Sequence, residues 1–246
     1  MDTNTHQFAL DQSGPQQQIG NDLGQLSASP PPFQLTASQA KGPIQRKLQF
    51  TGEEENVKQA IDLLNKHLFW HDAVLGEDGF VTLEPNGIQG PPTPRQQALY
   101  DHLKTIIDNP ATTSVKVDSG NSSVIAGSYK LSTIDMQDLL AYGDDGGKSD
   151  IGTMAHELVE QYYKQVHSTG YGGESHGAHH EGINAENDVN GYTRGPQRMI
   201  SASENEDGTL DAVVELDFTH PEGNVVTSRI SIKGNNVISN VNKEKK

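Results

Sequence analysis

The sequence predicts an α+β fold: a central helix pair, a small mixed sheet and a C-terminal antiparallel β-meander, preceded by a disordered leader. Three observations predict it. The first 43 residues are rich in Gln, Ser, Pro and Gly, several segments up to Asn190 repeat apolar residues at helical spacing, and strand-like runs follow Met199. We therefore expect a leader over 1–43 and a single domain over 44–246.

The composition of 1–43 predicts a disordered leader. It contains Pro30-Pro31-Pro32 and cannot bury enough apolar area to offset the entropy lost on ordering. The mean hydropathy of −0.65 fits a normal core diluted by such a leader.

The first half of the domain alternates strand and helix patterns. Thr93 is the expected N-cap of one helix, because Pro94 suits the first helical position. Apolar residues three and four apart predict the helices, and alternation or short apolar runs predict the strands. The expected strands are 43–50, 80–83, 114–117 and 124–129, and the expected helices are 53–70, 94–108 and 134–140.

The second half contains the helix pair and the meander. A helix over 151–167, with Ser149 or Asp150 as N-cap, is followed by the glycine-rich turn 170–173 and a helix over 175–190. The meander, about 198–242, is expected to pair 210–218 with 225–232, and then with 237–241 across a Gly-Asn-Asn turn.

Charge and composition restrict the partners. The net charge of −15 argues against nucleic acid, because phosphate binding requires clustered Lys and Arg. With no cysteine, a metal site must use His, Asp or Glu. No segment has the length of a membrane span, and no basic stretch followed by an apolar run opens the sequence. We expect synthesis in the cytoplasm and no Sec-type export.

Two side chains of the first helix have the spacing of metal ligands. His156 and Glu160 are four residues apart and project together from the flank of an apolar stripe. Glu157 follows the first ligand, which is the position of the general base in zinc hydrolases with a His-Glu-x-x-His motif. Two histidines and one carboxylate form a known catalytic zinc set. The pentapeptide alone is also compatible with a surface histidine flanked by solvated carboxylates.

The second helix offers a third ligand. If 175–190 is helical and returns antiparallel, His179 comes beside His156, and Glu186 lies on the same face as a further ligand or a support for one. His176 and His180 are the alternatives. Tyr163 and His167, further along the first helix, are candidates for donating a hydrogen bond to an oxyanion.

Two short segments resemble known families. Met154 to Tyr163, followed by Ala178-His179 and Ala185-Glu186-Asn187, resembles zincin-like metallopeptidase domains of bacterial toxins and injected effectors. The common zincin pattern has His where this chain has Glu160. Phe33 to Ala37 and Pro43 to Leu48 are similar to the front end of proteins encoded beside extracellular contractile injection systems, which are phage-tail-like particles.

The resemblance implies a secreted effector. It would be cargo loaded into the tube lumen of such a particle through its leader, delivered to a target cell by a non-Sec route, with a peptide or protein as substrate. It also implies that His156, Glu160 and His179 bind Zn²⁺ while Glu157 is the general base. The alternative is a non-catalytic cargo or structural component of the particle, with the histidine cluster incidental.

Overall fold

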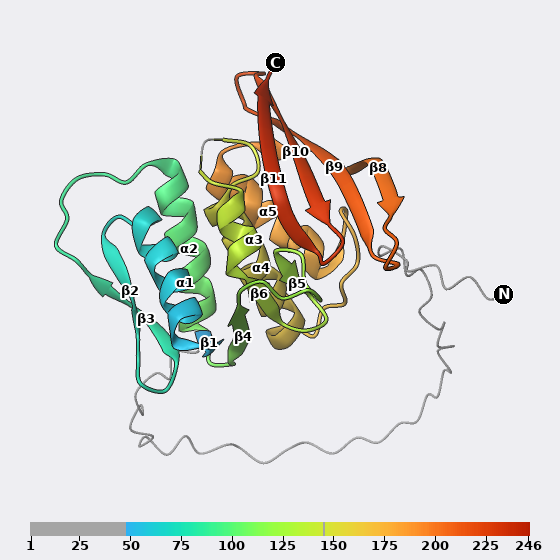
Figure 1. Ribbon diagram of the computed structural model, residues 1–246. Coiled ribbons are helices and arrows are strands. Elements are labelled where there is room, and N and C mark those ends of the chain that lie inside the picture. The colour runs from blue at the N-terminus through green and yellow to red at the C-terminus, as the bar shows by residue number, and fades with distance from the viewer. Residues whose placement is uncertain (1–47, 145) are drawn as a thin grey trace, which may run out of the picture. The chain divides into compact units, whose positions relative to one another are not determined.

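The structure is a computed structural model that describes residues 48–144 and 146–246. It is a mixed α+β fold with one mixed sheet and one C-terminal antiparallel sheet, as the sequence predicts (Figure 1). The predicted leader, 1–43, and the first part of the strand predicted over 43–50 lie outside the described residues.

The first sheet has six strands in the order β2-β3-β1-β4-β6-β5. Strands β1, β4 and β6 run parallel, and the remaining neighbours pair antiparallel. Its strands are β1 (Leu48–Gly52), β2 (His71–Leu75), β3 (Phe80–Pro85), β4 (Thr113–Asp118), β5 (Gly127–Ser128) and β6 (Thr133–Asp135). The short strand β5 is one edge of this sheet.

Within the described residues, five helices accompany the sheets, and local sequence explains where two of them begin. The Thr93 side chain accepts from the amide of Gln96, whose side chain accepts from the amide of Thr93, so a complete capping box starts α2. The Ser149 side chain accepts from the amide of Gly152 and starts α4. The helices are α1 (Glu54–His67), α2 (Pro94–Asp108), α3 (Met136–Ala141), α4 (Asp150–Val166) and α5 (Gly177–Asn190).

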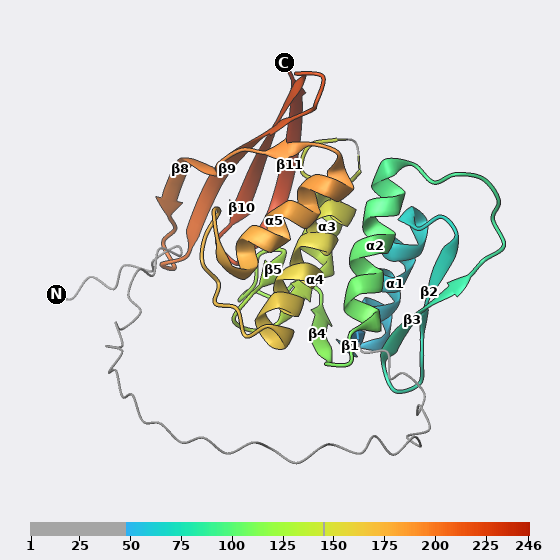
Figure 2. The same cartoon turned by 180° about the vertical axis from the view of Figure 1, so that it is seen from behind.

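Helix α4 packs deeply into the main core. Its predicted apolar stripe is buried at Ile151, Ala155, Leu158 and Tyr162, and Val166 packs at the margin of the same cluster. Helix α5 lies beside α4 (Figure 2). The two run antiparallel, because His179 meets Glu160 near one end of the contact and Glu186 meets His156 near the other.

The C-terminal sheet forms a second core. Its order is β11-β10-β9-β7, with β8 also paired to β9. The strands are β7 (Thr193–Arg194), β8 (Arg198–Glu204), β9 (Leu210–Thr219), β10 (Val225–Lys233) and β11 (Val237–Lys245). Val214, Leu216 and Phe218 of β9 pack with Tyr142, which precedes α4, so this sheet contacts the segment that leads into the candidate site.

Several element predictions were wrong in detail. Strands β2 and β6 were not predicted, and the strand expected over 124–129 is only β5. Ala126 has a φ of 58°, and its amide donates to the Asp138 carboxylate, so side-chain hydrogen bonds replace strand pairing there. Helix α1 ends at His67 instead of Trp70, because the Asn65 side chain hydrogen-bonds both backbone groups of Ala73 and brings β2 back against the helix.

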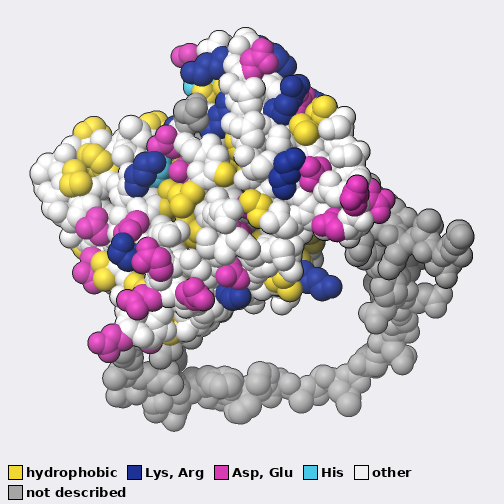
Figure 3. Space-filling model, in the orientation of Figure 1, with side chains coloured by type: hydrophobic (Ala, Val, Ile, Leu, Met, Phe, Trp, Pro, Cys, Tyr) yellow, Lys and Arg dark blue, Asp and Glu magenta, His cyan; other side chains and the backbone are white. Residues whose placement is uncertain are grey.

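The surface in Figure 3 mixes acidic side chains with Lys and Arg. Among the described residues, no helix combines the length and the apolar character that crossing a bilayer requires.

Candidate metal centre

Three predicted ligands converge between α4 and α5. His156, Glu160 and His179 each offer a donor atom, and these atoms lie within 4.8 Å of one another. Nε2 of His156 is 3.2 Å from Nδ1 of His179, which is 2.9 Å from Oε2 of Glu160. Both α4 residues are almost completely buried, whereas His179 is partly exposed. One point between them is therefore within reach of two imidazoles and one carboxylate.

The connection between the helices positions His179. The amide of Ala178 donates to the carbonyl of Gly170, and the amide of His179 donates to that of Tyr171. Gly172 has a φ of +73°, and a Cβ there would lie 2.1 Å from the carbonyl oxygen of His176. This close backbone approach, which only glycine permits, folds the loop so that α5 starts beside Glu160.

Gly182 permits the close contact of the two helices. A Cβ at this position would lie 2.9 Å from both Cδ2 and the carbonyl oxygen of His156. Although glycine weakens a helix by propensity, here it lets the His156 ring lie directly against α5. The helix prediction for this segment was therefore right, and the glycine has a packing role.

Glu186 supports His156 from behind. Its carboxylate is completely buried, and Oε2 lies 3.2 Å from Nδ1 of His156. An ionised carboxylate only accepts, so Nδ1 donates to Glu186, and when the ring is neutral the lone pair is on Nε2, which faces His179 and Glu160. Of the two roles predicted for Glu186, the structure has the geometry of the supporting one.

Two buried cations hold Glu186, and the sequence did not indicate either of them. Nζ of Lys148 is 2.8 Å from Oε1, and Nη1 of Arg194 is 3.1 Å from Oε2. Burial alone would raise the pKa of Glu186, but Lys148, Arg194 and His156 outweigh it and hold this pKa well below its usual range. Glu186 is therefore ionised.

Glu157 is partly exposed, unlike its neighbours His156 and Glu160. Its carboxylate rests against Gly127 of β5, where a Cβ would lie 1.9 Å from its Cδ. Burial raises the pKa of Glu157 to about 7, and Glu160 adds to this, while His156 and Lys148 oppose it. A carboxylate that titrates near neutrality can take up and release a proton under ordinary conditions.

The ligand side chains are electrostatically paired. Burial acts to raise the pKa of Glu160, but hydrogen bonds from His156 and His179 outweigh it and lower this pKa to about 2. Burial acts to lower the pKa of His156, but Glu160 and Glu186 raise it overall, whereas burial keeps the pKa of His179 below its ordinary value. The three side chains thus present one anion, Glu160, and two imidazoles.

The other predicted site residues lie elsewhere. His176 is the N-cap of α5 and is exposed, and Nδ1 of His180 lies 2.7 Å from the carbonyl oxygen of Glu174. Tyr163 and His167 contact each other further along α4, with ring centroids 5.1 Å apart. The aromatic ring beside the ligands is instead Tyr171, stacked on His179 at 4.7 Å and 25°.

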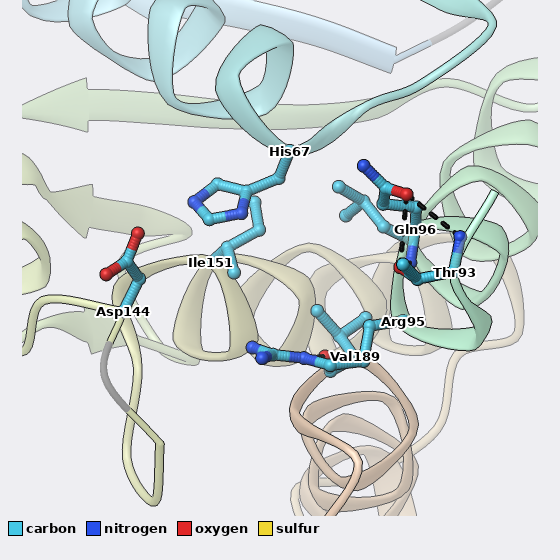
Figure 4. A pocket seen from close by; sticks show the side chains of 8 residues that line it. His67, Thr93, Arg95, Gln96, Asp144, Ile151 and Val189 are labelled. Atoms are coloured by element: carbon cyan, nitrogen blue, oxygen red, sulfur yellow. Dashed lines mark hydrogen bonds between the residues drawn. The ribbon is translucent and has the colours of Figure 1, made fainter.

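A separate polar pocket lies near the N-terminal end of α4. Figure 4 shows His67, Asp144 and Arg95 around it, and none of the three candidate ligands lines it. The Arg95 side chain is fixed there by donating to the carbonyl of Val189, 2.8 Å away.

Comparison of the chain with protein-family models, with curated proteins and with solved structures finds no match.

Proposed function

We propose that the chain is a zinc-dependent hydrolase of the metallopeptidase type, with His156, Glu160 and His179 as metal ligands and Glu157 as general base. The observation that carries the proposal is the convergence of these three donors in a largely buried site, with Glu157, whose pKa is raised to about 7, following His156 on α4. Two histidines and one carboxylate suit catalytic zinc, which keeps a further coordination position open.

The donors fit such an ion in charge and orientation. Glu186 fixes His156 so that Nε2 faces the other ligands, and Glu160 supplies the one anionic donor. When bound, zinc would supply Lewis-acid activation of a water and of an amide carbonyl. Glu157 would accept the proton of the attacking water and return it to the leaving amine, for which a pKa near 7 is well suited.

The same donor set also occurs in iron(II) oxygenases. Glu157 favours hydrolysis, because hydrolysis requires a proton acceptor beside the ligands. Elemental analysis of the purified protein shows whether the bound metal is zinc or iron.

Metal content tests the site. We expect about one zinc per chain by inductively coupled plasma mass spectrometry, since three first-sphere donors are present. His156→Ala should lose it, and His180→Ala, a matched change of a histidine bonded to a backbone carbonyl, should retain it.

Catalysis is tested separately, by hydrolysis of a mixed peptide library. Glu157→Gln should keep the zinc and abolish cleavage. A wild-type protein that takes up no metal after zinc loading and dialysis would refute the site, and cleavage retained by Glu157→Gln would refute the mechanism.

The resemblance of the leader supports a further proposal, that this hydrolase is effector cargo of a contractile injection particle, delivered outside the producing cell. Deletion of 1–43 should abolish co-purification with the particle while metal binding by the rest of the chain persists. An inert cargo would co-purify equally well but would show no effect of Glu157→Gln on target cells.

A further inference from the structure

The group formed by Lys148, Glu186 and Arg194, here called the buried clamp, has more charge than support of one histidine requires. A single carboxylate suffices to orient an imidazole. In this protein the carboxylate is bound by two cations, and the exposed fractions of the side chains are 9% for Lys148, 0% for Glu186 and 6% for Arg194. A second buried cation is costly unless it has another electrostatic role.

The charges of the ligands suggest that role. Three neutral histidines would leave the full charge of a divalent ion on the site, but Glu160 adds one negative charge. Burial lowers the pKa of Lys148, and the Glu186 carboxylate opposes this shift. With Lys148 and Arg194 both protonated, the buried clamp carries one net positive charge, because two cations surround one carboxylate. The charges of Glu160 and the buried clamp therefore sum to zero. The site then has the same total charge as one with three neutral histidines.

The clamp lies close enough for this charge to act on the site. The Oε2 atom that accepts from Arg194 is also the atom 3.2 Å from Nδ1 of His156. The contact continues to the other ligands through His156, whose Nε2 lies 3.2 Å from Nδ1 of His179. Because all three clamp side chains are buried, solvent screens these interactions weakly.

Arg194 has a second feature that fits an electrostatic role. Its Nε is buried and has no hydrogen-bond partner among the described residues, and Nη1 makes the contact with Glu186. Its backbone is fixed, since its amide donates to the side chain of Asn187 and its strand pairs with β9. The guanidinium is thus held in place at the cost of an incomplete hydrogen-bond set.

We infer that Lys148 and Arg194 are positioning residues that offset the negative charge of Glu160, so that the metal centre keeps a positive charge for an anionic ligand or an oxyanion. This inference rests on the proposed metal site.

The test uses Co²⁺-loaded protein and two small probes, azide and imidazole, with binding followed by the visible absorption of cobalt. Arg194→Met and Lys148→Met should each weaken azide binding on the order of tenfold, because one charge is lost near the metal. Binding of neutral imidazole should change by less than about twofold, since no donor of the metal is removed. Arg95→Met removes a cation that donates to the carbonyl of Val189 near the C-terminal end of α5 and contacts none of the candidate ligands; it is the control and should change neither.

A double variant that keeps the net charge of the buried clamp tests whether lost charge, and not misfolding, weakens azide binding. Arg194→Met combined with Glu186→Gln removes one charge of each sign and keeps an acceptor for His156, so azide affinity should return toward the wild-type value. Equal weakening of both probes, or no recovery in the double variant, would overturn the inference in favour of a purely structural clamp. Failure of the wild-type protein to take up Co²⁺ or Zn²⁺ would instead refute the proposed function.

Discussion

The two sides of the candidate metal centre are built differently. On the inner side, His156 is fixed by Glu186, which is itself fixed by Lys148 and Arg194, and all four side chains are nearly or completely buried. On the outer side, His179 is partly exposed and is covered by Tyr171, which is 39% exposed. The difference shows that buried side chains fix the charge and orientation of His156. The outer side consists of partly exposed side chains, including Tyr171 in the loop before α5 and Glu157.

Removal of Glu186, on the inner side, should reduce the stability of the protein most. Glu186→Ala leaves two buried cations without their carboxylate, and we expect the free energy of unfolding to fall by about 3–5 kcal/mol, as for other broken buried ion pairs. Urea denaturation of the metal-free protein measures this loss. Glu181→Ala, a partly exposed carboxylate on the same helix, is the control and should cost less than about 0.5 kcal/mol. Equal losses in the two variants would contradict the comparison.

Substitution of Glu157, on the outer side, should change stability by a smaller amount that depends on pH. Its pKa is about 7 in the folded protein against an ordinary 4.5, so the folded state binds more protons and stability falls as pH rises through this interval. Glu157→Gln removes that loss. The metal-free variant should be more stable than the wild type by about 1–3 kcal/mol above pH 7 and equal to it below pH 4.5.

Thermal unfolding at pH 4 and pH 8 measures the difference between the two proteins. A stability gain that is the same at both pH values would show that the raised pKa of Glu157 is not its cause.

Gly127→Ala should have the smallest of the three effects on stability. The added methyl group would overlap the Glu157 carboxylate, and this side chain can shift because it is partly exposed. We expect a loss of about 1 kcal/mol, at the low end for overpacking, with zinc content unchanged. In a Glu157→Gly background the same substitution should cost almost nothing, and a full loss there would mean that the methyl group clashes elsewhere.

Sequence periodicity predicted the part of the site that lies along helices. The i, i+4 relation gave His156 and Glu160, and the seven-residue separation of His179 and Glu186 placed both on the face that meets α4. His176 shared that expected face, but α5 begins only at Gly177, so this side chain lies outside the helix.

The remaining contacts depend on chain segments that no local pattern connects. Lys148 lies in a loop before α4, and Arg194 lies on a two-residue strand, so neither has a periodic neighbour that would indicate burial beside Glu186. The same applies to β5: its two residues are too few for an alternating pattern, and its Gly127 matters only because Glu157 folds against it.

The position of Arg194 in β7 has a consequence for how the molecule can be divided. A protein ending at Asn190 would retain every candidate ligand and the proposed general base, yet it would lack the guanidinium that contacts Glu186. It would also lack Ser228, whose Oγ accepts from the amide of Lys148 at 3.2 Å. Lys148 and Arg194 both contact the C-terminal sheet, which makes this sheet a structural part of the candidate metal centre instead of a separable module. A fragment that keeps both contacts must therefore extend through β10.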